Sequence, residues 1–545
     1  MGYATALDMI LTGKNVRPDK AKKMGLVDLV VDPDVLESVA VMQAQGLING
    51  TVKPTKRKRD WMNWFLEATP IGQNVMFSNA KKTVDKASGG FYPAPYKILE
   101  VIQNNIGKSK EEHLKDEAKK FTELAATTVS EALIGIFHGT SAVKKHNFGA
   151  VTHPIKNVAV LGAGLMGAGI AQISVDNGKY RVLLKDKDAT GVSRGEKVIE
   201  EALQGKLKKK RMTNHEYCET TSRLLPLHDG LDNWQRHFAQ ADIVIEAVFE
   251  DLAVKHKVVK EMEQVLPSHA IFASNTSAIP IAKIAEGAKR PERVIGMHYF
   301  SPVPMMPLLE IIAHAGTAPE VCAAAMEIGS KQGKTPIFVK DVPGFFVNRC
   351  LSPFMVEVIA LVKDGVSFET LDKAMKSYGM PVGPITLSDE VGIDISYHVG
   401  SFMAKADLGV RMEGGNHNIM KTMVEKGLLG RKAGKGFYLY PKDAKKGAPK
   451  QLNPEVLALL KSLQETEGWA KSSTLPVEDI QMRLISRFVN EAAFCLQDGI
   501  IRNPVDGELL LSWVLFTLFL FALILAVSHI YIYFLAFLSC IYIFR

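Results

Sequence analysis

One histidine stands where it could act as an acid or a base. His298 lies in VIGMHYF (294–300), whose alternating residues predict a β-strand, and Glu310 lies twelve residues later inside LLEII, a second apolar strand. If the strands are neighbours, the carboxylate can hold one imidazole nitrogen and leave the other free to take a proton. Alcohol oxidation needs such a base for the hydroxyl proton. A core histidine with its polar edge satisfied is the alternative interpretation.

Two further polar residues stand near the starts of predicted elements. Ser277 follows an apolar strand in ASNTSAIP (273–280), and Asn348 lies in a long helix that begins after Pro343 and Gly344. As hydrogen-bond donors they could hold substrate oxygens while charge shifts. A turn or N-cap for Ser277 and a tolerated helix polar residue for Asn348 are the alternatives.

A glycine pattern predicts a dinucleotide site. Gly162, Gly164 and Gly167 form G-x-G-x-x-G between an apolar strand and a helix of small residues, and Asp186 ends the next strand, YRVLLKD. Pyrophosphate would sit on free N–H groups at the helix N-terminus, while a carboxylate at the second strand binds a ribose diol and repels a 2′-phosphate. The pattern therefore favours NAD over NADP. A purely structural strand-to-helix turn is the alternative.

Further candidates for cofactor contacts lie at the same predicted edge of the sheet. Met166 belongs to the glycine loop, and AVFED (247–251) follows another apolar strand. Open α/β sheets bind ligands outside the carboxyl ends of their strands. We therefore add to the candidate cofactor site Met166, Val248, Glu250, Lys255 and Asn275.

The pattern of apolar residues along the sequence predicts the strands and helices that must position these residues. From Lys156, short apolar strands alternate with helices, which indicates βαβ units and a parallel sheet covered on both faces. From Pro343 helical patterns dominate. The fold class is thus a Rossmann-type α/β domain followed by an all-α domain. Before Lys156, residues 1–33 predict a helix, a turn and the strand GLVDLVV (25–31), and residues 34 to about 150 are mostly helical.

Charge and cysteine content exclude several classes of protein. The formal net charge is +8, with basic runs at 53–59 and 206–211 that are typical of solvated helix faces, or of surfaces for anionic ligands or acidic lipid. No zinc-finger or RNA-recognition pattern occurs, so we expect no nucleic-acid partner. The five cysteines form no C-x-x-C pair, so we expect no metal site and no disulfide framework. The first residues show no signal-peptide pattern.

The C-terminal end is unlike the rest. Residues 509–544 contain no Asp, Glu, Lys or Arg and would reach about 54 Å as one helix, against a hydrocarbon core of about 30 Å. A membrane anchor, a variant chain end that interrupts a helical domain, and an insoluble fragment are the three interpretations.

Over residues 156–440 the chain resembles the 3-hydroxyacyl-CoA dehydrogenase family, whose motifs occur here in order as VLGAGLMGAGIAQ, IVIEAVFED, FASNTSAIPI, VIGMHYFSPVP, LLEII, VKDVPGFFVNR and GRKAGKGFY. The resemblance implies NAD-dependent oxidation of an L-3-hydroxyacyl-CoA. It further implies His298 as the catalytic acid/base and Glu310 as its partner. In the same way it implies substrate contacts at Ser277 and Asn348, and an NAD site lined by Asp186, Glu250 and Lys255.

The flanks resemble α-subunits of the mitochondrial trifunctional enzymes of fatty-acid β-oxidation. Residues 1–33 are similar to the end of a crotonase (enoyl-CoA hydratase) domain, whose catalytic carboxylates fall before residue 1 in the family pattern, so we expect no hydratase activity. The resemblance implies long acyl chains, a thiolase-type β-subunit and a mitochondrial location at the matrix or inner membrane. A catalytically weak, membrane-tethered assembly subunit is the rival hypothesis.

These observations predict the following order of domains: a crotonase remnant (1–33), a helical linker region (34–152), the NAD-binding Rossmann domain (153–336), the helical C-terminal dehydrogenase domain (337–440), the start of a second helical domain (441–508) and the apolar tail (509–544).

Overall fold

The computed structural model describes residues 2–53, 61–143, 145, 147–231, 233–406, 408–414, 418–441 and 450–507. The chain divides into the units Met1–Glu131 and Ala132–Arg545. No helix within the described ranges combines the length and apolar character needed to cross a bilayer. The apolar stretch 509–544 lies outside the described residues.

The first unit is helical, as predicted for most of it. Its core is small and consists of Leu7, Met76, Phe77, Val84 and Leu99. The helices are α1 (Tyr3–Thr12), α2 (Pro18–Met24), α3 (Leu36–Ile48), α4 (Trp61–Ala68), α5 (Pro70–Ser88), α6 (Pro93–Asn104) and α7 (Lys110–Ala125), with the short 3-10 helix η1 (Pro33–Val35), and α8 (Thr128–Ala142) follows.

The strand predicted at 25–31 is wrong. Gly25 ends α2 in the left-handed conformation, and residues 27–32 belong to no helix or strand. A strand needs a neighbour for its main-chain N–H and C=O groups, and the described part of this unit offers no other strand. Apolar residues of the segment stay partly exposed, Leu29 at 46% of its surface.

In the second unit, eight strands of the described chain form one sheet in the order β3-β2-β1-β4-β5-β6-β7-β8. The strands are β1 (Asn157–Leu161), β2 (Arg181–Asp186), β3 (Leu224–His228), β4 (Ile243–Glu246), β5 (Ile271–Ser274), β6 (Val294–Tyr299), β7 (Leu308–Ala313) and β8 (Thr335–Lys340). Since β2 and β4 flank β1, the strand order reverses beside β1, where doubly wound sheets form their ligand crevice. The expected Rossmann-type sheet is confirmed.

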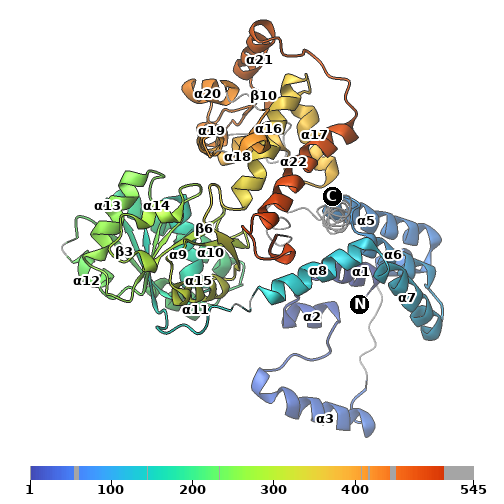
Figure 1. Ribbon diagram of the computed structural model, residues 1–545. Helices are drawn as coiled ribbons and strands as arrows, with labels where there is room; N and C mark the ends of the chain where they lie inside the picture. The colour runs from blue at the N-terminus through green and yellow to red at the C-terminus, as the bar shows by residue number, and fades with distance from the viewer. Residues whose placement is uncertain are drawn as a thin grey trace, which may run out of the picture. The chain divides into compact units, whose positions relative to one another are not determined.

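Helices cover both faces of this sheet, and Figure 1 shows α13 and α14 on one side and α10 and α15 on the other. The glycine loop leads into α9, which packs on β1 and β2. The helices are α9 (Leu165–Asp176), α10 (Ala189–Lys208), α11 (Asn214–Ser222), α12 (Trp234–Phe238), α13 (Leu252–Glu263), α14 (Ile281–Ala285) and α15 (Pro319–Lys331).

The sheet is mixed rather than wholly parallel, which corrects the prediction. Strand β7 runs antiparallel to β6, and β8 runs parallel to β7. The connection between β6 and β7 covers only residues 300–307, and a connection of that length cannot make the crossover that parallel strands require. This reversal places the predicted acid directly beside the predicted base.

The helical part begins at α16, and its elements appear in yellow to red in Figure 1. They are α16 (Val347–Lys363), α17 (Phe368–Tyr378), α18 (Pro384–Val391), α19 (Ile393–Ala404), α20 (Asn418–Glu425), β9 (Tyr438–Leu439), β10 (Gln451–Leu452), α21 (Pro454–Thr466) and α22 (Val477–Gln497). Helix α22 packs along α16, and β10 pairs with β9. The described residues after 441 therefore pack on the helices before them, and a domain boundary there stays a prediction.

Candidate active site

His298 and Glu310 face each other on adjacent strands. They are directly opposite in the antiparallel β6–β7 register, and His298 Nδ1 lies 2.6 Å from Glu310 Oε2. The histidine exposes 4% of its surface and the glutamate none. An ionised carboxylate only accepts hydrogen bonds, so Nδ1 carries the proton and Nε2 is left as the basic nitrogen. The predicted neighbourhood of the two strands is confirmed.

The second oxygen of Glu310 holds the start of the helical part. Its Oε1 accepts hydrogen bonds from the main-chain N–H groups of Phe346 and Val347, both at 3.1 Å, where α16 begins. The first N–H groups of a helix have no partner within the helix and favour a negative charge. One buried carboxylate thus orients the imidazole and fastens α16 to the sheet.

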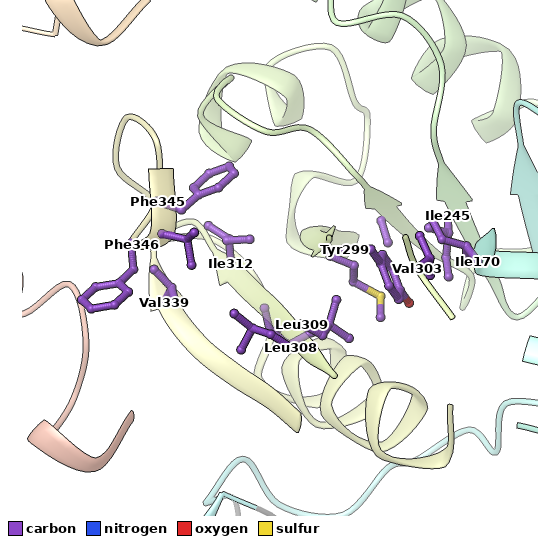
Figure 2. Close-up of a cluster of buried hydrophobic side chains, with 14 of the residues drawn as sticks. Ile170, Ile245, Tyr299, Val303, Leu308, Leu309, Ile312, Val339, Phe345 and Phe346 are labelled. Carbon is purple, nitrogen blue, oxygen red and sulfur yellow. The ribbon is translucent and has the colours of Figure 1, made fainter. Parts of the chain in front are cut away.

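Two aromatic rings enclose the imidazole. The Phe300 ring centroid lies 4.5 Å from that of His298, and the Phe345 ring centroid lies 5.8 Å away. Phe345 has a φ of 52°, a left-handed conformation that is uncommon for a bulky residue, and it is fully buried. Figure 2 shows the Phe345 ring on the side of Ile312, while the Phe346 ring points the opposite way, beside Val339. These walls keep water away from the His298–Glu310 pair.

Ser277 and Asn348 meet, although 71 residues separate them. The Asn348 side-chain amide donates a hydrogen bond to the Ser277 carbonyl at 2.8 Å. Ser277 stands in the turn after β5 rather than at a helix N-cap, because α14 begins only at Ile281. Asn275, in the same turn, accepts a hydrogen bond from the Tyr299 N–H at 2.8 Å and so ties this turn to the end of β6, next to His298.

Glu250 holds the turn that contains Ser277 through hydrogen bonds. Its Oε1 accepts hydrogen bonds from the Thr276 hydroxyl at 2.6 Å and from the Ser277 N–H at 2.8 Å. Burial opposes ionisation of Glu250, but the Lys255 ammonium and these hydrogen bonds outweigh it, so the pKa of Glu250 is held below its usual range. The predicted cofactor residue is therefore an anion that holds the Ser277 turn.

Glu246 is a buried carboxylate of the candidate site that the sequence interpretation missed. It is fully buried at the end of β4, where both its oxygens accept hydrogen bonds from Lys255 Nζ at 2.9 Å. The Val248 N–H and the Ser274 hydroxyl also donate to it, at 2.8 and 2.6 Å. Lys255 exposes only 1% of its surface, so this predicted cofactor residue is a buried partner of Glu246 and Glu250. An acid ending the apolar run IVIE was the signal that could have revealed Glu246.

The glycine loop has the shape of a pyrophosphate cradle. Gly162 has a φ of +91°, and a Cβ there would lie 2.6 Å from the Ala247 carbonyl oxygen. A Cβ at Gly167 would lie 1.8 Å from the Gly162 carbonyl oxygen. A Cβ at Gly164 would meet no atom within 4 Å, and its φ of −68° suits any residue. Packing explains two of the glycines, and the open space over Gly164 fits a ligand at the α9 N-terminus.

Asp186 lies at the end of β2, as predicted, and is partly exposed. Its Oδ2 accepts a hydrogen bond from the Ala163 N–H at 2.6 Å and its Oδ1 accepts one from the Lys187 N–H at 2.7 Å. These bonds hold the carboxylate beside the glycine loop while lone pairs remain for a ribose diol. Met166, in the first turn of α9, is half-buried against the core of this unit.

Models of known protein families match the part of the chain that contains the His298–Glu310 pair and the glycine loop. The NAD-binding domain of 3-hydroxyacyl-CoA dehydrogenase matches residues 157–342, and the C-terminal domain of 3-hydroxyacyl-CoA dehydrogenase matches residues 344–440. The fatty acid oxidation complex subunit alpha of Shewanella baltica (strain OS185) is 42% identical over 511 residues, which cover 93% of this chain and 70% of that protein. The chain belongs to the 3-hydroxyacyl-CoA dehydrogenase family. Its expected cofactor, NAD, is confirmed.

Other proteins resemble this dehydrogenase as well. The alpha subunit of Shewanella amazonensis is also 42% identical, with the same shares of the two chains covered. The crystal structure of 3-hydroxybutyryl-CoA dehydrogenase from Escherichia coli K12 is 26% identical with a TM-score of 0.54, covering 65% of this chain and 87% of that one. The dehydrogenase is thus an NAD-dependent oxidoreductase with the fold of its family.

Proposed function

We propose that this chain oxidises an L-3-hydroxyacyl-CoA to the 3-oxoacyl-CoA in fatty-acid β-oxidation, with His298 as the base. The observation that carries the proposal is the buried His298–Glu310 pair, with its 2.6 Å contact, in a family defined by this reaction. NAD, when bound, supplies the hydride acceptor. The protein's own side chains remove the proton and orient the substrate.

The chain's own groups divide the work of proton removal. His298 Nε2 takes the proton of the substrate hydroxyl, and Glu310 keeps the imidazole in the tautomer that leaves Nε2 free and stabilises the cation that forms. The Ser277 hydroxyl and the second amide hydrogen of Asn348 orient the substrate oxygen. Phe300 and Phe345 exclude water from the pair.

The test is NADH production by the full chain from a 3-hydroxyacyl-CoA. His298→Gln removes the base, and we expect a fall in kcat of about 10²-fold or more, with the affinity for NAD retained. His215→Gln, at an exposed position of α11, is the matched control and should keep wild-type activity. A kcat of His298→Gln equal to that of the wild type would refute the mechanism.

The partner, substrate length and location are proposals that rest on resemblance. Relatives are alpha subunits of fatty acid oxidation complexes, which supports a complex with a β-subunit; we propose one of the thiolase type. Because the flanking motifs resemble those of trifunctional enzymes, we also propose long acyl chains, a mitochondrial location, the trifunctional type and a crotonase origin for residues 1–33. Co-purification with a co-expressed thiolase-type subunit tests the partner, and comparison of C4 with C16 substrates tests the chain length.

Membrane tethering is a separate proposal that depends on residues 509–544 alone. Carbonate extraction of membranes from cells that express the full chain tests it, because an integral protein stays in the pellet. Release into the supernatant would remove the tethered assembly subunit from consideration.

A further inference from the structure

The turn between α15 and β8, residues 332–334, is a polar junction behind the catalytic strand. The Gln332 side chain accepts a hydrogen bond from the Tyr299 hydroxyl at 2.7 Å and donates one to the Ser174 hydroxyl at 2.8 Å. Gln332 and Ser174 are fully buried, and Tyr299 exposes 1% of its surface. Buried polar groups of this kind fix one arrangement of their elements. The turn thus joins the cofactor helix α9 to β6, one residue after His298.

Lys334 extends this junction to the segment after β6. The lysine exposes 8% of its surface, and its ammonium donates to the main-chain carbonyls of Val303 and Met306, the second at 2.5 Å. Burial of a cation is costly unless its donors are satisfied. Within the described chain the ammonium donates to these main-chain carbonyls, so the lysine holds this one turn.

The turn that Lys334 holds (residues 302–306) lies between the catalytic strand and the cofactor helix. The N–H groups of Met305 and Met306 both donate to the Pro302 carbonyl, at 2.9 and 3.0 Å, so the turn is compact. Val303 packs against α9, since a Cβ at Gly169 would lie 2.8 Å from it. In Figure 2, Val303 lies in the same buried cluster as Tyr299 and Ile170.

The same turn connects directly to the wall of the active site. Phe300, whose ring lies 4.5 Å from that of His298, lies two residues before Pro302, the first residue of the turn. Met305 exposes 75% of its surface, and Phe300 and Met306 are half-buried. The segment therefore carries one apolar ring beside His298 and, a few residues on, an exposed and a half-buried methionine, which are side chains suited to contact with an acyl chain.

We propose that Lys334 is a positioning residue that clamps the 302–306 turn, and that this turn contributes to recognition of the acyl substrate. The proposal deepens the proposed function and rests on it for the identity of the substrate. The clamp itself is a property of the fold. Loss of the ammonium takes a donor away from the carbonyls of Val303 and Met306 and frees the segment that carries Phe300.

The test compares Lys334→Met, which keeps the length of the side chain without its donors, with Lys334→Arg, which keeps charge and donors. Lys331→Met is the matched control, because Lys331 is 51% exposed and pairs only with Glu327 on its own helix among the described contacts. All variants are made in the full chain. Should Lys334→Met fail to fold, Lys334→Gln takes its place in both measurements below.

The first measurement is hydrogen–deuterium exchange, which needs no activity. We expect the amides of Met305 and Met306 to exchange about ten-fold faster in Lys334→Met than in the wild type, with β1 and β5 unchanged. Lys334→Arg and Lys331→Met should exchange as the wild type. Equal exchange in Lys334→Met and Lys331→Met would overturn the clamp, whatever the enzyme turns over.

The second measurement separates positioning from general destabilisation. In Lys334→Met the KM for the acyl substrate should rise about five-fold while kcat stays within about two-fold and the KM for NAD is unchanged, and Lys334→Arg should recover most of the loss. A parallel rise of both KM values would overturn substrate recognition by the turn. A wild-type chain without turnover would contradict the proposed function, and exchange would still decide the clamp.

Discussion

The carboxylate of Glu310 serves two parts of the molecule at once. One oxygen orients His298, and the other caps α16 through the N–H groups of Phe346 and Val347. A neutral group at this position would accept fewer hydrogen bonds and would not stabilise an imidazolium. In the proposed mechanism the charge of Glu310 stabilises the imidazolium that forms on His298.

We expect Glu310→Gln to lower kcat by about 10²-fold, because the amide keeps the shape but not the charge. The affinity for NAD should stay within about two-fold, since the cofactor residues lie on other strands. Stopped assays of NADH formation and a titration with NAD measure the two quantities. Glu327→Gln, at a 42% exposed side chain of α15, is the control. A kcat near the wild-type value would contradict the assigned role of Glu310.

The glycines of the cofactor loop make a second residue-scale prediction. Gly164→Val places a side chain in open space in an allowed conformation, so we expect an unchanged Tm and an NAD Kd raised about ten-fold or more. Gly167→Ala should instead destabilise the fold by about 2 kcal/mol, because its Cβ would meet the Gly162 carbonyl oxygen at 1.8 Å. Thermal unfolding and NAD titration distinguish the two variants. Similar Tm losses in both would contradict the ligand explanation for Gly164.

At the scale of elements, the contact of α16 with α22 bears directly on the site. Arg349 follows Asn348 on α16, and its Nε donates to Glu491 Oε1 of α22 at 2.7 Å, with both side chains almost fully buried. Asp498 also contacts Arg349 at 3.3 Å. Helix α22 therefore stabilises the turn of α16 that carries Asn348, a candidate substrate-binding residue.

We expect Glu491→Ala to lower the free energy of unfolding by about 3 kcal/mol, because a buried guanidinium loses its main partner. The double variant Arg349→Met with Glu491→Met should recover much of this loss, since no charge then remains buried. Denaturant unfolding of the single and double variants measures both. If the double variant were as unstable as Glu491→Ala, packing rather than the unpaired charge would explain the loss.

At the scale of the whole molecule, Lys334 gives the stability a distinct dependence on pH. Burial lowers the pKa of Lys334 to about 8 from the ordinary value of 10.5. Between these values the unfolded chain binds more protons than the folded chain, so this lysine makes the free energy of unfolding rise with pH. Below about pH 8 both states are charged, and the full cost of the buried charge is present.

We therefore expect the stability of the wild type, relative to Lys334→Met, to increase between about pH 8 and pH 10.5 and to be constant below pH 8. Urea unfolding at several pH values in this window measures the difference. Subtracting the free energy of unfolding of Lys334→Met from that of the wild type removes the contribution of the titratable groups that the two proteins share. A difference that is flat over the window, or falls, would contradict the lowered pKa.

The sequence by itself determined much of the fold and of the site. Periodicity and the glycine pattern are local signals, and they predicted the Rossmann sheet, the glycine loop, Asp186 and the pairing of His298 with Glu310. The prediction failed for the strand at 25–31, because an apolar run does not reveal whether a partner strand exists. It also missed the reversal of β7, which depends on a connection too short for a crossover.

Only the tertiary structure decided which polar groups share a hydrogen bond. Asn348 donates to the Ser277 carbonyl across 71 residues, and Lys334 donates to the carbonyls of Val303 and Met306 across 31 and 28 residues. Such contacts join residues far apart in the chain, and the types and spacing of the side chains do not show which of these residues lie close together in the fold. The sequence predicted the His298–Glu310 pair, the proposed base with its partner, and the cofactor loop because each depends on neighbours within one or two elements. The groups that position the base became visible only when the sheet and α16 were packed together.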